Sequence, residues 1–258
     1  MSPGAITANI DVAQIVLYMF WVFFAGLVYY LHQESKREGY PLERDGRGGR
    51  AVIEGFPAIP TPKTFTLQNG DVWMAPGPNS ARQTLTGAEP TSRIPGSPIS
   101  PLGNPMLAGV GPGAYAMRED VPDLTFEGQL RLLPLRLADG YDVASNDPDP
   151  RGMPVLGADG QVGGTVVDLW VDRSEAIFRY IEIDVATAGG KRTVLLPMNF
   201  ARVTARQVRV RSILGAQFVD VPGIAKPGQI TRLEEERVMA YYGAGTLYAT
   251  PARQEPLL

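Results

Sequence analysis

Residues 12–31 read VAQIVLYMFWVFFAGLVYYL, a stretch with no charged residue and with Gln14 as its one strongly polar side chain. A helix of about 20 apolar residues crosses the hydrocarbon core of a bilayer. A helix is also the only open-ended element that satisfies all its backbone hydrogen bonds within lipid. The stretch therefore predicts a transmembrane helix at residues 12–31, followed by a large domain on one side of the membrane.

The charges on either side of this stretch predict its orientation. All 24 lysines and arginines follow it, starting at Lys36, whereas Asp11 is the one charged side chain before it. Because loops rich in Lys and Arg stay in the cytoplasm, residues 1–11 are predicted to lie outside and residues 32–258 inside. A cleaved signal peptide is the alternative, but the segment lacks a basic n-region and its apolar core is too long. We expect the helix to be retained as a single span.

The composition excludes several classes of site. The chain has no cysteine and a single histidine, His32, at the end of the apolar stretch. Disulfides, iron–sulfur clusters, covalent c-type haem and thiolate zinc sites are thereby excluded. Ser–His and Cys–His catalysis cannot be assembled in the soluble part. The net charge of −3 argues against nucleic acid as a partner. We expect a chain that binds no pigment or metal alone and is not an enzyme by itself.

Residues 32–105 are predicted to be an extended segment, because prolines recur there too closely for long helices or central strands. Apolar side chains are nevertheless spread along it. Such a segment can become ordered by lying on the surface of a partner, and proline lowers the entropy lost on ordering. Residues 63–67 and 71–74 are predicted to form a hairpin around an Asn-Gly turn.

Residues 106–258 are predicted to form one globular domain made mainly of strands. The apolar pattern indicates strands at 129–136, 164–172, 178–185, 191–196, 200–203 and 207–210. Short strands joined by tight turns indicate a small antiparallel β-barrel or sandwich.

One helix near the C-terminus is predicted to complete this domain. Thr231 and Glu234 have the spacing of a capping box, and Gly243 is predicted to end the helix. Glu234, Glu235 and Glu236 suit the positive end of the helix dipole, and we interpret them as a solvated helix start.

The segment 167–185, VDLWVDRSEAIFRYIEIDV, contains the candidate site of the domain. Arg179 shares strand parity with apolar neighbours and is predicted to point toward the apolar face, where a guanidinium requires a carboxylate partner. Asp172 and Glu175 lie just before it. Carboxylates near one cation have shifted, coupled pKa values and suit a proton relay, but a structural ion pair closing the barrel fits the same pattern. Glu182, on the opposite strand face, is expected to be solvated.

Several short motifs follow one another along the chain. They are FWVFFAGLVYYL in the span, REGYPLE at 37–43, PKTF at 62–65, GVGP at 109–112, VVDLWVD at 166–172, LLPM at 195–198, and LEEE and YGAGTLYA near the C-terminus. In this order they resemble the H subunit family of the photosynthetic reaction centre of purple bacteria. REGYPLE directly after a lone span is the most specific of them, and the resemblance extends over nearly the whole chain.

The resemblance implies a place in a larger complex. The helix would pack beside the pigment-binding L and M subunits, and the domain, a barrel of the PRC type, would cap them on the cytoplasmic side of the bacterial inner (photosynthetic) membrane, with the N-terminus periplasmic. Bacteriochlorophyll, bacteriopheophytin, quinones, carotenoid and non-haem iron would be held by L and M. A light-harvesting ring, a cytochrome subunit and membrane lipids are further partners that the resemblance suggests. The implied role is to stabilise the complex and to supply protons to the secondary quinone.

The resemblance also assigns proton transfer to particular residues. The internal proton-path acid of the family matches Glu175, with Asp172 and Arg179 as its neighbours in the same motif. Some members carry two histidines at the surface entry, where this chain has Glu127 and Gln129. If protons enter there, Glu127 is expected to collect them; otherwise the entry lies elsewhere, among Asp123 and the surface acids.

Two hypotheses therefore stand. The first is an H-type subunit that acts as a structural cap and proton conduit. The alternative is a membrane-tethered adaptor that uses a PRC-like barrel to dock another cytoplasmic protein. The extended segment discriminates between them, because a cap needs it covered by partner subunits whereas a solitary adaptor would leave it sensitive to proteases.

Overall fold

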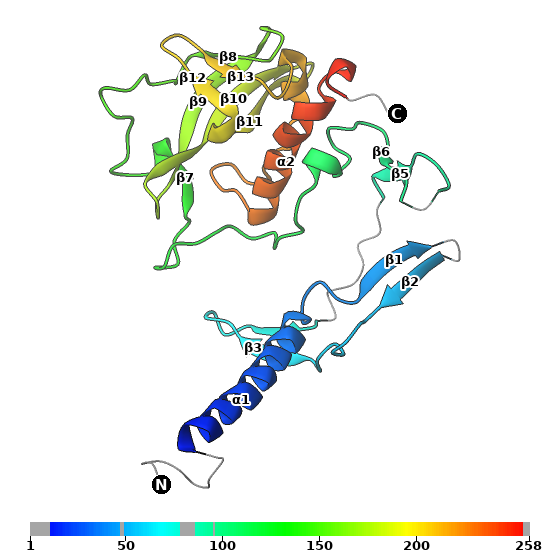
Figure 1. Cartoon of the computed structure of the whole chain (residues 1–258). Coiled ribbons are helices and arrows are strands. Elements are labelled where there is room, and N and C mark those ends of the chain that lie inside the picture. The colour runs from blue at the N-terminus through cyan, green and yellow to red at the C-terminus, as the bar shows by residue number, and fades with distance from the viewer. Residues whose placement is uncertain (1–10, 47–48, 78–85, 95, 255–258) are drawn as a thin grey trace. The chain divides into compact units, whose positions relative to one another are not determined.

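The computed structural model describes residues 11–46, 49–77, 86–94 and 96–254. Of the predicted outer segment, residues 1–11, only Asp11 lies within these ranges. The chain divides into two compact units, Met1–Thr84 with Thr91–Pro98, and Leu85–Pro90 with Ile99–Leu258. Figure 1 shows both units, with most of their helices and strands labelled.

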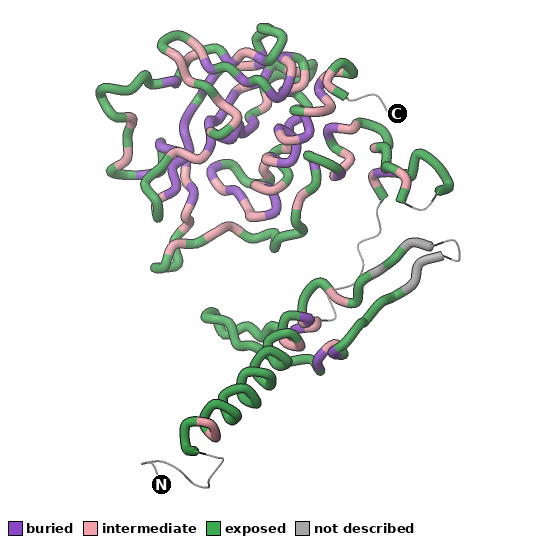
Figure 2. Tube along the Cα trace, in the orientation of Figure 1, coloured by how far each residue is buried: buried purple, intermediate pink, exposed green. Residues whose placement is uncertain are grey.

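The first unit contains helix α1, Val12–Ser35. Asp11 caps its start, because Oδ1 accepts a hydrogen bond from the backbone N–H of Gln14 at 2.7 Å. The helix is exposed along almost its whole length (Figure 2), and it is long and apolar enough to cross a membrane. The predicted helix is confirmed, and it continues beyond Leu31 to Ser35.

Lys36 ties the end of α1 to the chain that follows. Its Nζ is buried and donates hydrogen bonds to the carbonyl oxygens of Glu54 at 2.8 Å and Pro57 at 2.5 Å. The same ammonium lies 4.9 Å from the ring centroid of Tyr40. A buried ammonium needs such acceptors to offset the loss of water, so this contact fixes the loop at residues 54–57 against the helix end.

Short antiparallel strand pairs follow in the first unit. Strand β1 (Leu42–Gly46) pairs with β2 (Gly49–Ile53), and β3 (Lys63–Thr66) pairs with β4 (Val72–Ala75). The predicted hairpin is confirmed by β3 and β4, with Gly70 in its turn at φ +87°, a conformation that favours glycine.

The second unit is built on a seven-stranded sheet with the order β11-β10-β9-β8-β13-β12, and β7 pairs with β9. Its strands are β7 (Leu132–Pro134), β8 (Pro154–Leu156), β9 (Val162–Asp172), β10 (Ile177–Thr187), β11 (Gly190–Pro197), β12 (Ala201–Val203) and β13 (Val208–Val210). All pairs are antiparallel except β8 with β13, which is parallel. The predicted strand at 129–136 is shorter than expected, because a 3₁₀ turn follows β7 at Leu135–Leu137. A further pair, β5 (Ala88–Pro90) with β6 (Ile99–Pro101), also belongs to this unit.

The core of the second unit lies around β9, β10 and β11, where the buried residues of Figure 2 concentrate. Trp170 and Ile181 are fully buried there. Close packing also explains a glycine in β9, because a Cβ on Gly163 would lie 2.2 Å from the ring of Phe218. The β9–β10 pair is therefore a rigid support for side chains at its ends.

Helix α2, Arg232–Tyr248, packs beside this sheet (Figure 1). The predicted capping box is confirmed: the Thr231 hydroxyl accepts from the Glu234 N–H at 3.2 Å, and the Glu234 carboxylate accepts from the Thr231 N–H at 2.9 Å. The prediction that Gly243 ends the helix is wrong. A Cβ at Gly243 would lie 2.6 Å from the carbonyl oxygen of Pro112, so this glycine lets the 3₁₀ turn at Gly111–Gly113 pack closely against the helix.

Candidate functional site

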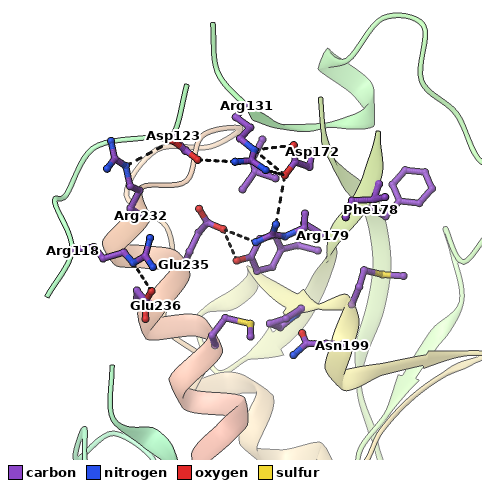
Figure 3. Close-up of a pocket in the computed structure, with 16 residues that line it drawn as sticks. Arg118, Asp123, Arg131, Asp172, Phe178, Arg179, Asn199, Arg232, Glu235 and Glu236 are labelled. Carbon is purple, nitrogen blue, oxygen red and sulfur yellow. Dashed lines mark hydrogen bonds and ion pairs between the residues drawn. The ribbon is translucent and has the colours of Figure 1, made fainter. Parts of the chain in front are cut away.

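Arg131 holds three carboxylates together where β7 meets the end of β9. Its Nε lies 2.9 Å from each carboxylate oxygen of Asp172, its Nη2 lies 2.5 Å from Glu175 and its Nη1 lies 3.3 Å from Asp123. Figure 3 shows Arg131 between Asp123 and Asp172. Leu132 of β7 pairs with Asp172 of β9, so Arg131, which directly precedes Leu132, lies beside these acids. The structure thus brings Asp172 and Glu175 together as predicted, through an arginine that the sequence analysis did not single out.

Asp172 and Glu175 differ in their exposure to solvent. Only 1% of the Asp172 side chain is exposed, against 53% for Glu175. Burial disfavours the ionised form of Asp172, but hydrogen bonds from Arg131 and from the backbone N–H groups of Glu175 and Ser174 outweigh it, so the pKa of Asp172 lies below its usual value. Asp172 is therefore held ionised inside the protein, in contact through Arg131 with an acid at the surface.

Arg179 is not placed as the alternation of the strand predicted. Its guanidinium lies 3.5 Å from Asp172 and 3.9 Å from Glu235, and 41% of its side chain is exposed. The register between β9 and β10 shifts between Phe178 and Tyr180, so Arg179 falls at a bulge, where strict alternation ends. The predicted contact with Asp172 is confirmed, and the predicted position on the apolar face is wrong.

Glu235, in the first turn of α2, is the acid of this site that the sequence analysis missed. It accepts a hydrogen bond from the Tyr180 hydroxyl at 2.8 Å, and 17% of its side chain is exposed. Burial raises the pKa of Glu235 above its usual value, although Tyr180 and Arg179 act in the opposite direction. The interpretation of this helix start as solvated is wrong for Glu234 and Glu235, because the turn faces other parts of the domain: Glu234 accepts from the N–H of Ala225 at 2.6 Å.

The shifted pKa of Glu235 predicts a pH-dependent effect on stability. A carboxyl whose folded-state pKa is raised stabilises the fold below its unfolded pKa and loses that contribution as the pH rises through the folded value. Glu235→Gln keeps an acceptor for Tyr180 and removes the buried charge. We expect the Tm of this variant, relative to the native chain in the same detergent, to increase between pH 4 and pH 8.

Glu236→Gln is the matched control for this change, because Glu236 follows on the same helix and pairs with Arg118 at 2.7 Å on a half-exposed surface. Its Tm difference should stay nearly constant over the same range, since surface ion pairs contribute little. Parallel pH profiles for the two variants would contradict the burial effect at Glu235.

The site lines an open pocket of ≈ 650 Å³ between the end of the β9–β10 pair and α2. Its charged lining residues are Arg118, Asp123, Arg131, Asp172, Arg179, Arg232, Glu235 and Glu236. Arginine stays protonated in proteins, so the carboxylates and any water in the pocket are the groups that can take up and release protons. In the part of the chain that the structure describes, no three His, Cys, Asp or Glu side chains form a group suited to a metal ion.

A second charged cluster lies farther along β9. Arg136 Nη1 lies 2.9 Å from Asp168 and 2.8 Å from Glu182, and the indole N–H of Trp170 donates to Glu182 at 2.7 Å. The expectation that Glu182 is solvated is wrong, because chain from β7 onward covers this face of the strand and supplies Arg136. The carboxylates of both clusters are thus held by arginines from the β7 region.

Glu127 lies in an exposed turn closed by a hydrogen bond from the Gly128 N–H to the Thr125 carbonyl at 3.0 Å. Its own backbone N–H and the Thr125 hydroxyl lower the pKa of Glu127. Among the described residues, no hydrogen bond or ion pair joins its carboxylate to Arg131 or Asp172. Its role at a proton entry stays a prediction.

Two family models match the chain. Residues 4–137, just over half of the chain, match the model for the photosynthetic reaction centre, H-chain N-terminal region. Residues 142–217, which include β8 to β13 and both Asp172 and Glu175, match the PRC-barrel domain. The second match confirms the predicted barrel-type β domain, and the first confirms the resemblance stated on the short motifs. The chain belongs to the family of photosynthetic reaction centre H chains.

Proposed function

We propose that this H chain caps the pigment-binding L and M subunits on the cytoplasmic side of the bacterial inner membrane and conducts protons toward the secondary quinone. Family membership makes it a subunit of a reaction centre, associated with other subunits of that complex. The lack of Lys and Arg before α1 and their abundance after it support an orientation with the N-terminus in the periplasm.

The exposed apolar surface of the first unit supports the capping role. Beyond α1, exposed side chains include Phe56, Phe65 and Trp73. Contiguous exposed apolar surface is typical of sites that bind other proteins or lipid. A helix in the membrane and strand pairs that follow it would together lie against partner subunits, which are the occupants expected of a reaction-centre H chain.

The pigments, quinones and iron would be held by the partner subunits. Quinone that is reduced twice takes up two protons, and a site buried under a cap needs a route for them. The chemistry that this chain would supply is therefore the passage of protons, carried out by its carboxylates and by pocket water.

A single observation carries the proton-conduction proposal: the half-exposed carboxylate of Glu175 is joined through Arg131 to the buried carboxylate of Asp172. Asp172 is in turn linked through Arg179 to Glu235. An acid at the surface is thus connected to acids inside the protein. Such a series is what a proton path needs, and an isolated structural ion pair would not require it.

The pKa values give these acids different roles. Asp172, with its lowered pKa, keeps a negative charge that attracts protons into the pocket. Glu235, with its raised pKa, holds a proton to a higher pH than Asp172 does and is the acid better suited to pass one on. Arg131 and Arg179 position the carboxylates and do not themselves exchange protons. Glu175 would admit protons from solvent.

Purification in mild detergent tests the capping role. Material that copurifies with this chain should carry the absorption spectrum of reaction-centre pigments, and residues 44–105 should resist limited proteolysis in the complex. Removal of the partner subunits should expose these residues to the protease. A chain that purifies without pigment-bearing partners, or that is cleaved throughout residues 44–105 in the intact complex, would contradict the cap.

A further inference from the structure

A group of arginines on the β12–β13 hairpin has no part in the proton site. Between Asp184 and Asp220 the sequence has no acidic residue, and the hairpin and its flank contribute Arg202, Arg206, Arg209 and Arg211. We call these four residues the arginine patch. All four are exposed. The chain as a whole has a net charge of −3, so this concentration of positive charge is local.

The arginine patch differs in its partners from the arginines that hold the carboxylates of this unit. Arg131, Arg136 and Arg151 each contact at least two carboxylates. Within the described ranges, no carboxylate lies in ion-pair distance of any member of the patch. With its amide oxygen turned toward Arg209, Gln207 accepts hydrogen bonds from Nε at 2.6 Å and from Nη2 at 2.8 Å.

The strand register adds like-charge repulsion to this lack of partners. Arg202 of β12 stands directly opposite Arg209 of β13. Like charges that face each other across an antiparallel pair destabilise it. Arg211 follows directly after β13, which ends at Val210, and lines the same hollows as Arg202 and Arg209. Three arginines therefore surround the same hollows with no carboxylate of the described residues in ion-pair distance, and an anion bound among them would relieve the repulsion.

The surface beside the patch is hollowed. A pocket of ≈ 890 Å³ is lined by all four arginines together with the turn at Gly157–Gly160. A neighbouring hollow shares Arg202, Arg209 and Arg211 and is also lined by Ser212, whose buried hydroxyl has no hydrogen-bond partner in the described part of the chain. Arginine matches phosphate oxygens with two parallel N–H donors. A pocket of this size holds more than a single ion.

We propose that the arginine patch binds a phosphate group, from an anionic lipid headgroup or from a free phosphate compound. The site is separate from the Arg131 cluster and does not depend on proton conduction. Both sources would be bound in the same way. The guanidinium groups of Arg202 and Arg209 donate hydrogen bonds to the phosphate oxygens, and Arg206 and Arg211 add positive charge at the rim of the pocket.

The test uses the full chain in neutral detergent at physiological ionic strength. Inorganic phosphate and short-chain phosphatidylglycerol are titrated separately, with the arginine Nε–Hε signals in NMR spectra as the readout. Saturable shifts with phosphate indicate a free phosphate ligand, and saturable shifts with the lipid alone indicate a headgroup; either supports the site. Shifts with neither, or shifts that chloride reproduces at equal ionic strength, would overturn it.

Two variants separate binding from folding. Arg209→Gln should weaken binding about tenfold, the loss expected for a charge-assisted contact, whereas Arg237→Gln, which removes an exposed charge from α2, should leave it unchanged. Arg202→Glu converts the repulsive pair into an ion pair, so it should raise Tm while abolishing binding. Retained binding in Arg202→Glu, or equal weakening by Arg237→Gln, would contradict the assignment.

Discussion

Replacing Arg131 with methionine is expected to destabilise the chain by about 3 kcal/mol, the cost typical of leaving a buried charge without its partner. Methionine has a similar length but removes the hydrogen bonds that Arg131 Nε donates to both carboxylate oxygens of Asp172, whose side chain is 1% exposed. Glu175 and Asp123 lose the same partner, and three carboxylates then repel one another. Denaturant unfolding of the purified chain at pH 7, compared with the native chain in the same detergent, measures this loss.

Arg151→Met is the matched control. Arg151 also bridges two carboxylates, Asp149 at 2.6 Å and Asp142 at 2.9 Å, but both are open to solvent. Surface pairs of this kind contribute about 0–1 kcal/mol, so this variant should remain close to the native chain. Equal losses for the two variants would show that burial of Asp172 does not determine the energy of the cluster.

The effect of Arg131→Met should also depend on pH. The folded-state pKa of Asp172 is lowered, so its contribution to stability is present above the unfolded pKa and is lost as the pH falls through the folded value. In the variant, burial without Arg131 favours the neutral form of Asp172. The difference in unfolding free energy between native and variant chains should therefore shrink from pH 7 toward pH 3. A difference that grows toward acid pH would contradict this account.

Glu175→Gln is expected to slow the proton-coupled second reduction of the quinone on the order of a hundredfold, the lower end of what a proton-transferring group typically contributes. Glutamine preserves the size of the side chain and can still accept a hydrogen bond from Arg131, but it cannot carry a proton. The first light-driven charge separation needs no proton and should be unchanged. Flash-induced absorbance of the purified complex measures both steps.

Asp142→Asn is the control for this kinetic test, because it removes another exposed carboxylate, one that contacts Arg151 and not Arg131. Its second-electron kinetics should match those of the native complex. Unchanged kinetics in Glu175→Gln would remove Glu175 from the proposed path. Loss of the initial charge separation would instead indicate damage to assembly and would equally contradict a role limited to protons.

Local patterns in the sequence were sufficient for much of the fold. The uncharged stretch from Val12 predicted α1, the Asn-Gly turn predicted the β3–β4 hairpin, and Thr231 with Glu234 predicted the start of α2. Each of these depends on residues close together in the chain, such as a cap and the backbone it binds. The end of α2 was predicted wrongly, because Gly243 is required for the close approach of the Pro112 carbonyl and not for ending the helix. Pro112 lies far away in the sequence.

The candidate site was only partly predictable for the same reason. Asp172, Glu175 and Arg179 lie within one short segment, and their proximity followed from the sequence. Arg131 and Glu235 come from a loop before β7 and from α2, and no local pattern connects them to β9. The bulge at Arg179 was likewise invisible, since it depends on how β10 pairs with β9.

The sequence by itself thus determined an N-terminal helix long and apolar enough to cross a membrane, a β domain and the absence of thiol chemistry. It determined them because an uncharged apolar stretch, the alternation of apolar residues and the residue inventory do not depend on tertiary contacts. The tertiary structure alone decided which carboxylates are buried, which arginines hold them and which pKa values rise or fall. Those properties depend on solvent exclusion and on distances between residues far apart in the chain, such as the 2.9 Å contact of Arg131 with Asp172.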